Sequence, residues 1–78
     1  MQTNEPLITI DNRITLAEAG RTVGVSPSAV FRWVREGRRG VRLEVAELGR
    51  RLYTSKPALT KFMNEVAEAR EANVQAVA

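Results

Sequence analysis

The chain has 78 residues, a formal net charge of +3, and neither cysteine nor histidine. A chain of this length forms one small domain with a modest hydrophobic core. Because cysteine and histidine are absent, we expect no disulfide, no zinc or other metal site, and no histidine-based acid–base catalysis.

Enzymatic activity and a cofactor are not expected either. The serines have no histidine or evident buried lysine to activate them, and the chain contains no glycine-rich phosphate-binding loop. No apolar run has the length of a membrane span or of a signal-peptide core. We therefore expect a cytoplasmic protein that makes no contact with a membrane.

The sequence predicts three consecutive parts. Residues 1–13 are expected to form an extended N-terminal arm, residues 14–66 the domain, and residues 67–78 the end of a helix or a flexible tail. Within the arm, the alternation of Ile8 and Ile10 permits a short extended stretch that packs on the core.

Two helices joined by a tight turn are predicted at the start of the domain. Thr15 and Glu18 have the spacing of a capping box, so a helix is expected to begin directly after Thr15. Gly24 can adopt the left-handed conformation that ends this helix. A second helix is predicted to begin at Pro27, with Ser26 as its N-cap.

The second helix is predicted to present two different faces and to end before Gly37. At 100° per residue, the inward face consists of hydrophobic residues: Pro27, Val30, Trp33 and Val34. The outward face carries Ser28, Arg32 and Arg35, with Phe31 beside them. The small residues Ala19 and Gly20 of the first helix would let the second helix approach closely.

A β-hairpin and a third helix are predicted to follow. Alternating apolar and charged residues over 41–46 predict a half-buried strand, and residues 51–54 predict a second one after a glycine-containing loop. A third helix is expected from Ser55, with an apolar stripe that covers the first two helices: Leu59, Phe62, Met63 and Val66. The predicted fold is mostly α with a small β-hairpin, that is, a winged helix-turn-helix with three helices and a two-stranded wing.

The positive charge is concentrated in the middle of the chain. Residues 32–51 hold seven arginines and three glutamates, which gives a net charge of 7 − 3 = +4. A helix-turn-helix with such a charge distribution is typical of proteins that bind double-stranded DNA. A solvated, arginine-rich surface without a nucleic-acid partner is the alternative.

The candidate DNA-binding residues lie on the second helix, on the hairpin and its approach, and at the start of the third helix. They are Ser26, Ser28, Phe31, Arg32, Arg35, Arg38, Arg39, Arg42, Arg50, Arg51 and Lys56. Arg32 and Arg35 can bond bidentately to guanine, unless they only pair with Glu36 and Glu44. Phe31 either touches a thymine methyl group or packs under the wing.

Four stretches of the sequence resemble a known group of DNA-binding proteins. They are residues 16–20 (LAEAG), 24–33 (GVSPSAVFRW), 40–44 (GVRLE) and 52–59 (LYTSKPAL). They are similar to the excisionase-like, MerR-related winged helix-turn-helix family, in a small bacterial or phage branch. The resemblance implies a recognition helix in the major groove, carried by Ser28, Arg32 and Arg35. It also implies wing contacts by a further set of arginines: Arg39, Arg42, Arg50 and Arg51.

The same resemblance implies a range of roles for a nucleoid-associated protein. Excisionases bend DNA and assist a phage integrase, while relatives activate or repress promoters or start DNA packaging. An integrase or another DNA-bound protein is therefore implied as a further partner, as is self-association on DNA. No small-molecule effector is expected, because the chain lacks the long coiled coil and the effector domain of full MerR regulators.

A second kind of function stays open from the sequence. The apolar stripe of the third helix continues weakly through Val74 and Val77. The chain can therefore also be a protein-interaction module on a winged-helix scaffold, which binds a partner or itself through this C-terminal helix.

Overall fold

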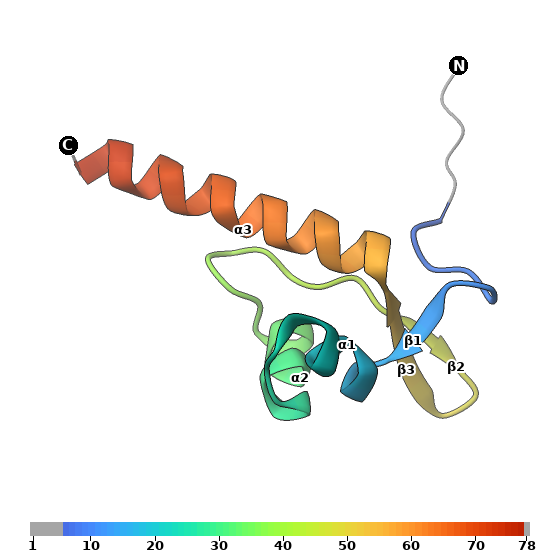
Figure 1. Cartoon of the computed structure of the whole chain (residues 1–78). Coiled ribbons are helices and arrows are strands. Elements are labelled where there is room, and N and C mark those ends of the chain that lie inside the picture. The colour runs from blue at the N-terminus through green and yellow to red at the C-terminus, as the bar shows by residue number, and fades with distance from the viewer. Residues whose placement is uncertain (1–5, 78) are drawn as a thin grey trace, which may run out of the picture.

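The computed structural model describes the backbone of residues 6–77 and the side chains of residues 6–71. This part contains three helices and a three-stranded antiparallel sheet (Figure 1). In chain order the elements are β1 (Arg13–Thr15), α1 (Leu16–Val23), α2 (Pro27–Arg35), β2 (Ala46–Leu48), β3 (Arg51–Ser55) and α3 (Lys56–Val77). Helices α1 and α2 pack together, and α3 passes over them from the sheet. No helix in the described part is long and apolar enough to cross a lipid bilayer.

The predicted starts of α1 and α2 and the predicted end of α1 are confirmed. Thr15 Oγ1 accepts the N–H of Glu18 at 3.1 Å, and Glu18 Oε1 accepts the N–H of Thr15 at 3.2 Å, which completes the capping box. Gly24 ends α1 with φ of 81°, in the left-handed region. Ser26 caps α2, because its Oγ accepts the N–H of Ala29 at 3.2 Å.

The connection between α1 and α2 passes very close to Gly20, where a close approach of the second helix itself was predicted. The carbonyl oxygen of Gly20 accepts the N–H groups of Gly24 and Val25, at 2.7 and 2.8 Å. A Cβ atom at position 20 would lie 2.6 Å from the carbonyl oxygen of Val25. Only glycine therefore fits at this point without moving the backbone.

The sheet differs from the predicted two-stranded hairpin. Strand β3 pairs with β2, but it also pairs with β1, so the strand order is β1-β3-β2. The predicted strand over 41–46 is wrong, because β2 begins only at Ala46. Gly49, with φ of 66°, lies in the turn that joins β2 to β3.

Residues 41–45 form no strand because their backbone hydrogen bonds go to α2 and to the turn that follows it. Val41 exchanges two backbone hydrogen bonds with Arg38, at 2.7 and 2.9 Å. Leu43 donates its N–H to the carbonyl of Trp33 at 3.2 Å, and its side chain is only 3% exposed. This segment therefore stays close to α2 and contributes to the core instead of to the sheet.

The predicted extended stretch in the N-terminal arm is also wrong. Ile8 packs against the core, but Ile10 is 74% exposed. The side chain of Asn12 bends the arm, because it accepts the N–H of Thr9 at 2.7 Å and donates to the carbonyl of Leu7 at 3.0 Å. The first five residues of the predicted arm lie outside the described part.

The core lies where the three helices and the sheet meet. Its buried hydrophobic residues are Ala19, Val30, Trp33, Leu43, Ala58, Leu59 and Phe62. The ring centroids of Trp33 and Phe62 are 5.0 Å apart, so these two rings join α2 to α3. The predicted inward orientation of Val30 and Trp33 is confirmed.

Two residues predicted to face the core are exposed instead. Pro27 stands in the first turn of α2, ahead of the part of the helix that packs against the core. Met63 follows Phe62 directly and is therefore turned by 100° from the buried side of α3. Its side chain lies at the edge of the contact between α3 and the core and is 37% exposed.

Two fully buried polar side chains hold the junction between β3 and α3 together. Thr54 Oγ1 donates to the carbonyl of Glu44 at 2.9 Å. Ser55 Oγ donates to the carbonyl of Leu7 at 2.7 Å and accepts the N–H of Ala58 at 3.1 Å. Ser55 thus caps α3 at the predicted position and also ties the N-terminal arm to it.

Helix α3 projects beyond α1 and α2 (Figure 1). Its backbone is helical to Val77, so the chain continues as a helix past the predicted domain boundary at residue 66. The side chains of Val74 and Val77, which were predicted to continue the apolar stripe, lie outside the described side chains.

We expect Gly20→Ala to destabilise the fold, although alanine favours helices more than glycine does. The new Cβ would meet the carbonyl of Val25, so α1 and the turn would have to separate. Urea titration should show a loss of about 1–3 kcal/mol in the free energy of unfolding. The exposed change Arg21→Ala in the same helix is the control and should change it by less than about 0.5 kcal/mol. A Gly20→Ala chain as stable as the original would contradict the close approach.

We expect Ser55→Ala to destabilise the protein by about 2–3 kcal/mol, because it removes a buried cap and also removes one of the two hydrogen bonds to the Leu7 carbonyl, leaving only the bond from Asn12. The matched control is Ser26→Ala, which removes an exposed cap and should lose about 1 kcal/mol. Both values come from the same urea titration. Equal losses for the two variants would show that Ser55 acts as an ordinary cap only.

Candidate nucleic-acid interface

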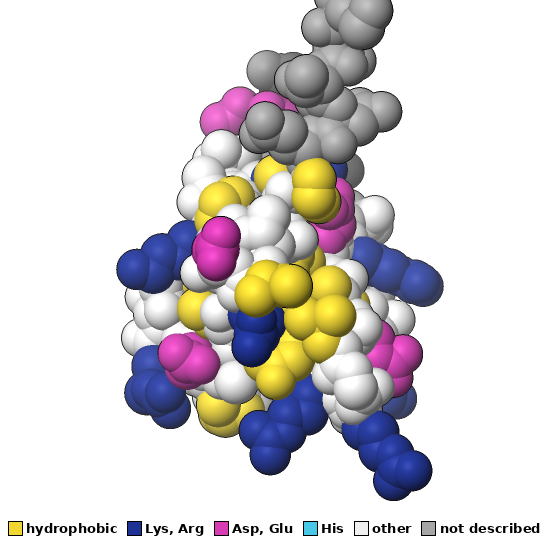
Figure 2. Space-filling model, turned by 90° about the vertical axis from the view of Figure 1, so that its right-hand side faces the viewer, with side chains coloured by type: hydrophobic (Ala, Val, Ile, Leu, Met, Phe, Trp, Pro, Cys, Tyr) yellow, Lys and Arg dark blue, Asp and Glu magenta, His cyan; other side chains and the backbone are white. Residues whose placement is uncertain are grey.

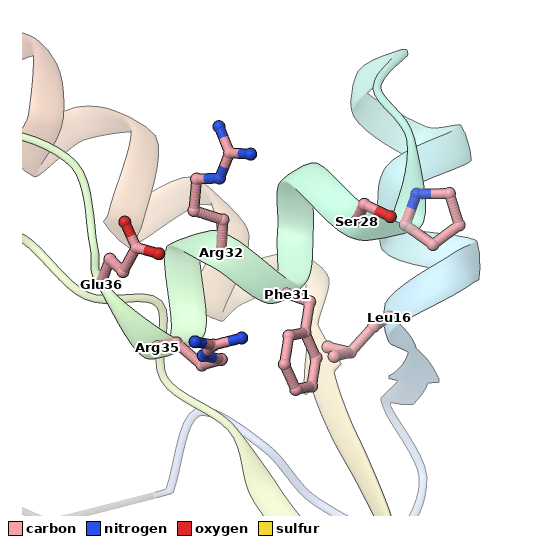
Figure 3. Close-up of a pocket in the computed structure, with 7 residues that line it drawn as sticks. Leu16, Ser28, Phe31, Arg32, Arg35 and Glu36 are labelled. Carbon is pink, nitrogen blue, oxygen red and sulfur yellow. The ribbon is translucent and has the colours of Figure 1, made fainter.

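The outward side of α2 carries a shallow hollow (Figure 3). It is lined by Leu16, Pro27, Ser28, Phe31, Arg32, Arg35 and Glu36. Arg32 points to one side of α2, Phe31 and Arg35 point to the other, and Leu16 reaches from α1 toward Phe31. The structure therefore brings four predicted site residues together on one exposed surface, which we call the α2 face: Ser28, Phe31, Arg32 and Arg35.

The opposite side of α2 fixes the orientation of this face. Val30 is fully buried and Trp33 is 9% exposed. Any rotation of α2 that hid the α2 face would move these two side chains into water. Removing a buried tryptophan side chain typically destabilises a protein by about 3–5 kcal/mol, so such a rotation is strongly unfavourable.

The two arginines of the α2 face are free to bind an external ligand. Neither Arg32 nor Arg35 forms an ion pair with any residue in the described part of the chain. Glu44, which was considered as their partner, is bonded instead to Lys61 at 2.6 Å. The hydrogen bond to Glu44, together with its charge, raises the pKa of Lys61. Glu36 lines the same hollow without such a bond.

Phe31 is an exposed part of this surface. Its ring is 42% exposed and lies beside Leu16 in Figure 3, so it is not packed under the hairpin. The guanidinium carbon of Arg35 is 5.7 Å from the ring centroid, within the range of a cation–π contact. The ring and the guanidinium therefore form one unit at the surface.

Ser26 is exposed at the start of α2, next to the α2 face. Its Oγ already accepts the N–H of Ala29 as the helix cap. The hydroxyl hydrogen of Ser26 is still able to donate to a phosphate or another acceptor.

Arg38 and Arg39 line a different hollow, which we call the α3 groove. Arg39 and Gly40 form a two-residue turn with positive φ values of 53° and 81°, and Arg38 directly precedes this turn. The α3 residues that complete the groove are Met63, Val66, Ala67, Arg70 and Glu71. Arg42 is exposed just after this turn.

The remaining predicted residues lie on the hairpin and at the start of α3. Arg50 is in the β2–β3 turn, Arg51 begins β3 and Lys56 begins α3, and all three are exposed. In Figure 1, the hairpin turn and α2 both lie on the side of the molecule away from α3. Figure 2 shows hydrophobic side chains in the middle of the neighbouring face, with both basic and acidic side chains around them. The turn that carries Arg50 is thus on the same side as α2.

Sequence reasoning missed the place of Leu16 in the α2 face and, elsewhere, the contact between Arg13 and Tyr53. The guanidinium carbon of Arg13 lies 5.3 Å from the ring centroid of Tyr53. Pairing of β1 with β3, which places Thr15 opposite Tyr53, brings Arg13 and the ring together, and nothing local in the sequence indicates this pairing. Leu16 is the first residue of α1, and only the packing of α1 against α2 brings it beside Phe31.

Comparison with known proteins gives one result. Residues 14–67 match the family described as Protein of unknown function (DUF1580), and this match covers more than half of the chain. Neither the curated proteins nor the solved structures contain a significant match. The matched region begins just before α1 and includes α2, the hairpin and the first half of α3. The chain therefore belongs to the family described as Protein of unknown function (DUF1580).

Proposed function

We propose that this protein is a sequence-specific, double-stranded DNA-binding protein with a winged helix-turn-helix arrangement. In this proposal α2 enters the major groove and the β2–β3 hairpin acts as the wing on the adjacent backbone or minor groove. The observation that carries the proposal is the α2 face: two exposed arginines, which have no ion-pair partner in the described part of the chain, stand on a helix whose orientation is fixed by Val30 and Trp33.

The dimensions and chemistry of α2 suit the major groove. A helix with its side chains is about 10–12 Å wide, and the major groove is about 12 Å wide. Arg32 and Arg35 can each donate two hydrogen bonds to the O6 and N7 atoms of a guanine. Ser28, near the start of α2, can bond to a phosphate or to a base edge.

The hairpin supplies contacts of a different kind. Arg50 stands in its turn, which lies on the same side of the molecule as α2, and Arg51 begins its second strand; both are exposed. Arginines in such positions neutralise phosphates or enter the minor groove. The phosphate contacts strengthen binding to every DNA sequence, because phosphates carry no direct sequence information.

A DNA-binding protein of this kind can act in one of two biological processes, DNA recombination or the regulation of transcription. An excisionase-like role, in which the protein bends DNA for a recombinase, uses the same module as a small transcriptional regulator. Selection of bound duplexes from a random DNA pool separates these roles best. Repeated half-sites in the selected DNA would also report how many copies of the chain bind.

We expect Arg32→Ala to reduce sequence preference and Arg50→Ala to weaken all binding alike. Loss of a bidentate contact to guanine should reduce the difference in binding free energy between a selected site and a random duplex by about 1–3 kcal/mol. The ratio of the two affinities should fall roughly 5- to 150-fold. Loss of one phosphate contact should lower the slope of log K against log salt by about 1. Fluorescence anisotropy at several salt concentrations measures both quantities.

The control for both variants is Lys61→Ala. Lys61 lies on α3, and its side chain is paired with Glu44. This change should leave the affinity and the preference within about twofold of the original chain. If Arg32→Ala keeps the full preference for the selected site, the proposed orientation of α2 on DNA is wrong.

A second candidate function is protein recognition through the α3 groove. The groove combines an apolar floor, in which Met63 is 37% exposed, with Arg38, Arg39 and Arg70 at its rim. Its charge fits an acidic amphipathic helix of another protein. A second copy of the chain fits less well, because a two-fold contact would bring arginine-rich rims together.

We therefore expect the isolated chain to be monomeric. Sedimentation equilibrium at increasing protein concentration should give one species with the mass of a single chain. A dimer that dissociates in the Met63→Ser variant would show instead that the α3 groove binds a second copy. Failure of the original chain to bind any duplex DNA at low salt would favour protein recognition over DNA binding.

A further inference from the structure

Phe31 is the one exposed large hydrophobic side chain of α2, whose residues all lie within the described part of the chain. It does not belong to the core cluster, and its ring lies at the surface between Arg35 and Leu16. Leu16 and Pro27 extend the apolar surface beside it within the same hollow. The α2 face therefore contains an apolar spot in an otherwise polar and cationic surface.

The apolar spot is coupled to one arginine in particular. Arg35 holds its guanidinium over the Phe31 ring, with its central carbon 5.7 Å from the ring centroid. Arg32 points to the other side of the helix (Figure 3). The arginine fork, which donates hydrogen bonds, and the apolar ring are thus neighbours on the α2 face.

The major groove offers one apolar group, and it has a fixed position. Thymine presents its C5-methyl group there, whereas cytosine presents none unless it is methylated at C5. Guanine presents two acceptors, O6 and N7, that match the arginine fork. A thymine or 5-methylcytosine beside a guanine therefore places a methyl group and two acceptors next to each other.

We propose that Phe31 and Arg35 together read a 5-methylpyrimidine next to a guanine. The C5-methyl group packs against the Phe31 ring and Leu16, while the Arg35 guanidinium donates to O6 and N7 of the neighbouring guanine. This inference rests on the proposed DNA-binding function and names the base step that the α2 face selects. It has a regulatory consequence, because methylation of a cytosine at this position strengthens binding.

The test removes single methyl groups from DNA. In a duplex selected from a random pool, each thymine is replaced in turn by deoxyuridine, which differs only by the C5-methyl group. The dissociation constant is measured by fluorescence anisotropy. We expect about fourfold weaker binding at one position of each bound site, the effect of one buried methyl group, and no change at the others. At that position, a 5-methylcytosine–guanine pair should bind about fourfold more tightly than a cytosine–guanine pair.

Protein variants assign the effect to its residue. Phe31→Ala should bind the thymine and deoxyuridine duplexes equally, whereas Phe31→Leu, which keeps an apolar side chain, should retain most of the difference. Because Phe31 lies outside the core, both variants should fold, and circular dichroism checks this. Arg35→Ala should lose the preference for the neighbouring guanine.

Two outcomes would overturn the inference while leaving the proposed function intact. One is specific binding with equal affinity for thymine and deoxyuridine at every position. The other is a methyl effect that persists in Phe31→Ala, which would assign it to another residue. Absence of any sequence preference in the original chain would overturn the proposed function itself and the inference with it.

Discussion

The burial of Trp33 against Phe62 is the contact on which the arrangement of this molecule depends. It joins α2 to α3, and the carbonyl of Trp33 also receives the N–H of Leu43 as the chain leaves α2. With Trp33 and Val30 buried, α2 has no freedom to turn about its own axis. This contact therefore determines which side chains of α2 face the solvent.

A second constraint sets how closely the two short helices approach. Gly20 allows the backbone at Val25 to pass at a distance that no side chain would permit. Close approach of α1 places Leu16 beside Phe31 and so shapes the apolar half of the α2 face. Core packing and the candidate site are thus linked: the same glycine that permits the tight turn also brings an apolar residue of α1 to the surface of α2.

The elements that could be predicted from the sequence are those defined by neighbours in the chain. The capping box of Thr15 and Glu18, the left-handed Gly24 and the cap at Ser26 involve residues a few positions apart, so their signals are local. The same holds for the α2 face, because the angle between side chains on a helix follows from their spacing alone.

The errors concern contacts between distant segments. Strand β1 exists because Ile14 pairs with Thr54, and no local pattern indicates that partner. Leu43 alternates with charged residues as a strand residue would, yet its N–H bonds to α2, so the strand begins later than predicted. The α3 groove, which gathers Arg38 and Arg70, also required the packing of the whole chain.

The central claim is that the α2 face and the hairpin turn bind DNA together. The most direct measurement is a two-dimensional NMR titration of the isotopically labelled protein with a selected duplex. The account predicts that the largest amide shift changes occur in residues 26–35 and 49–51, with smaller changes along α3. Shift changes confined to Met63, Val66 and Arg70 on α3, with an unaffected α2, would contradict it.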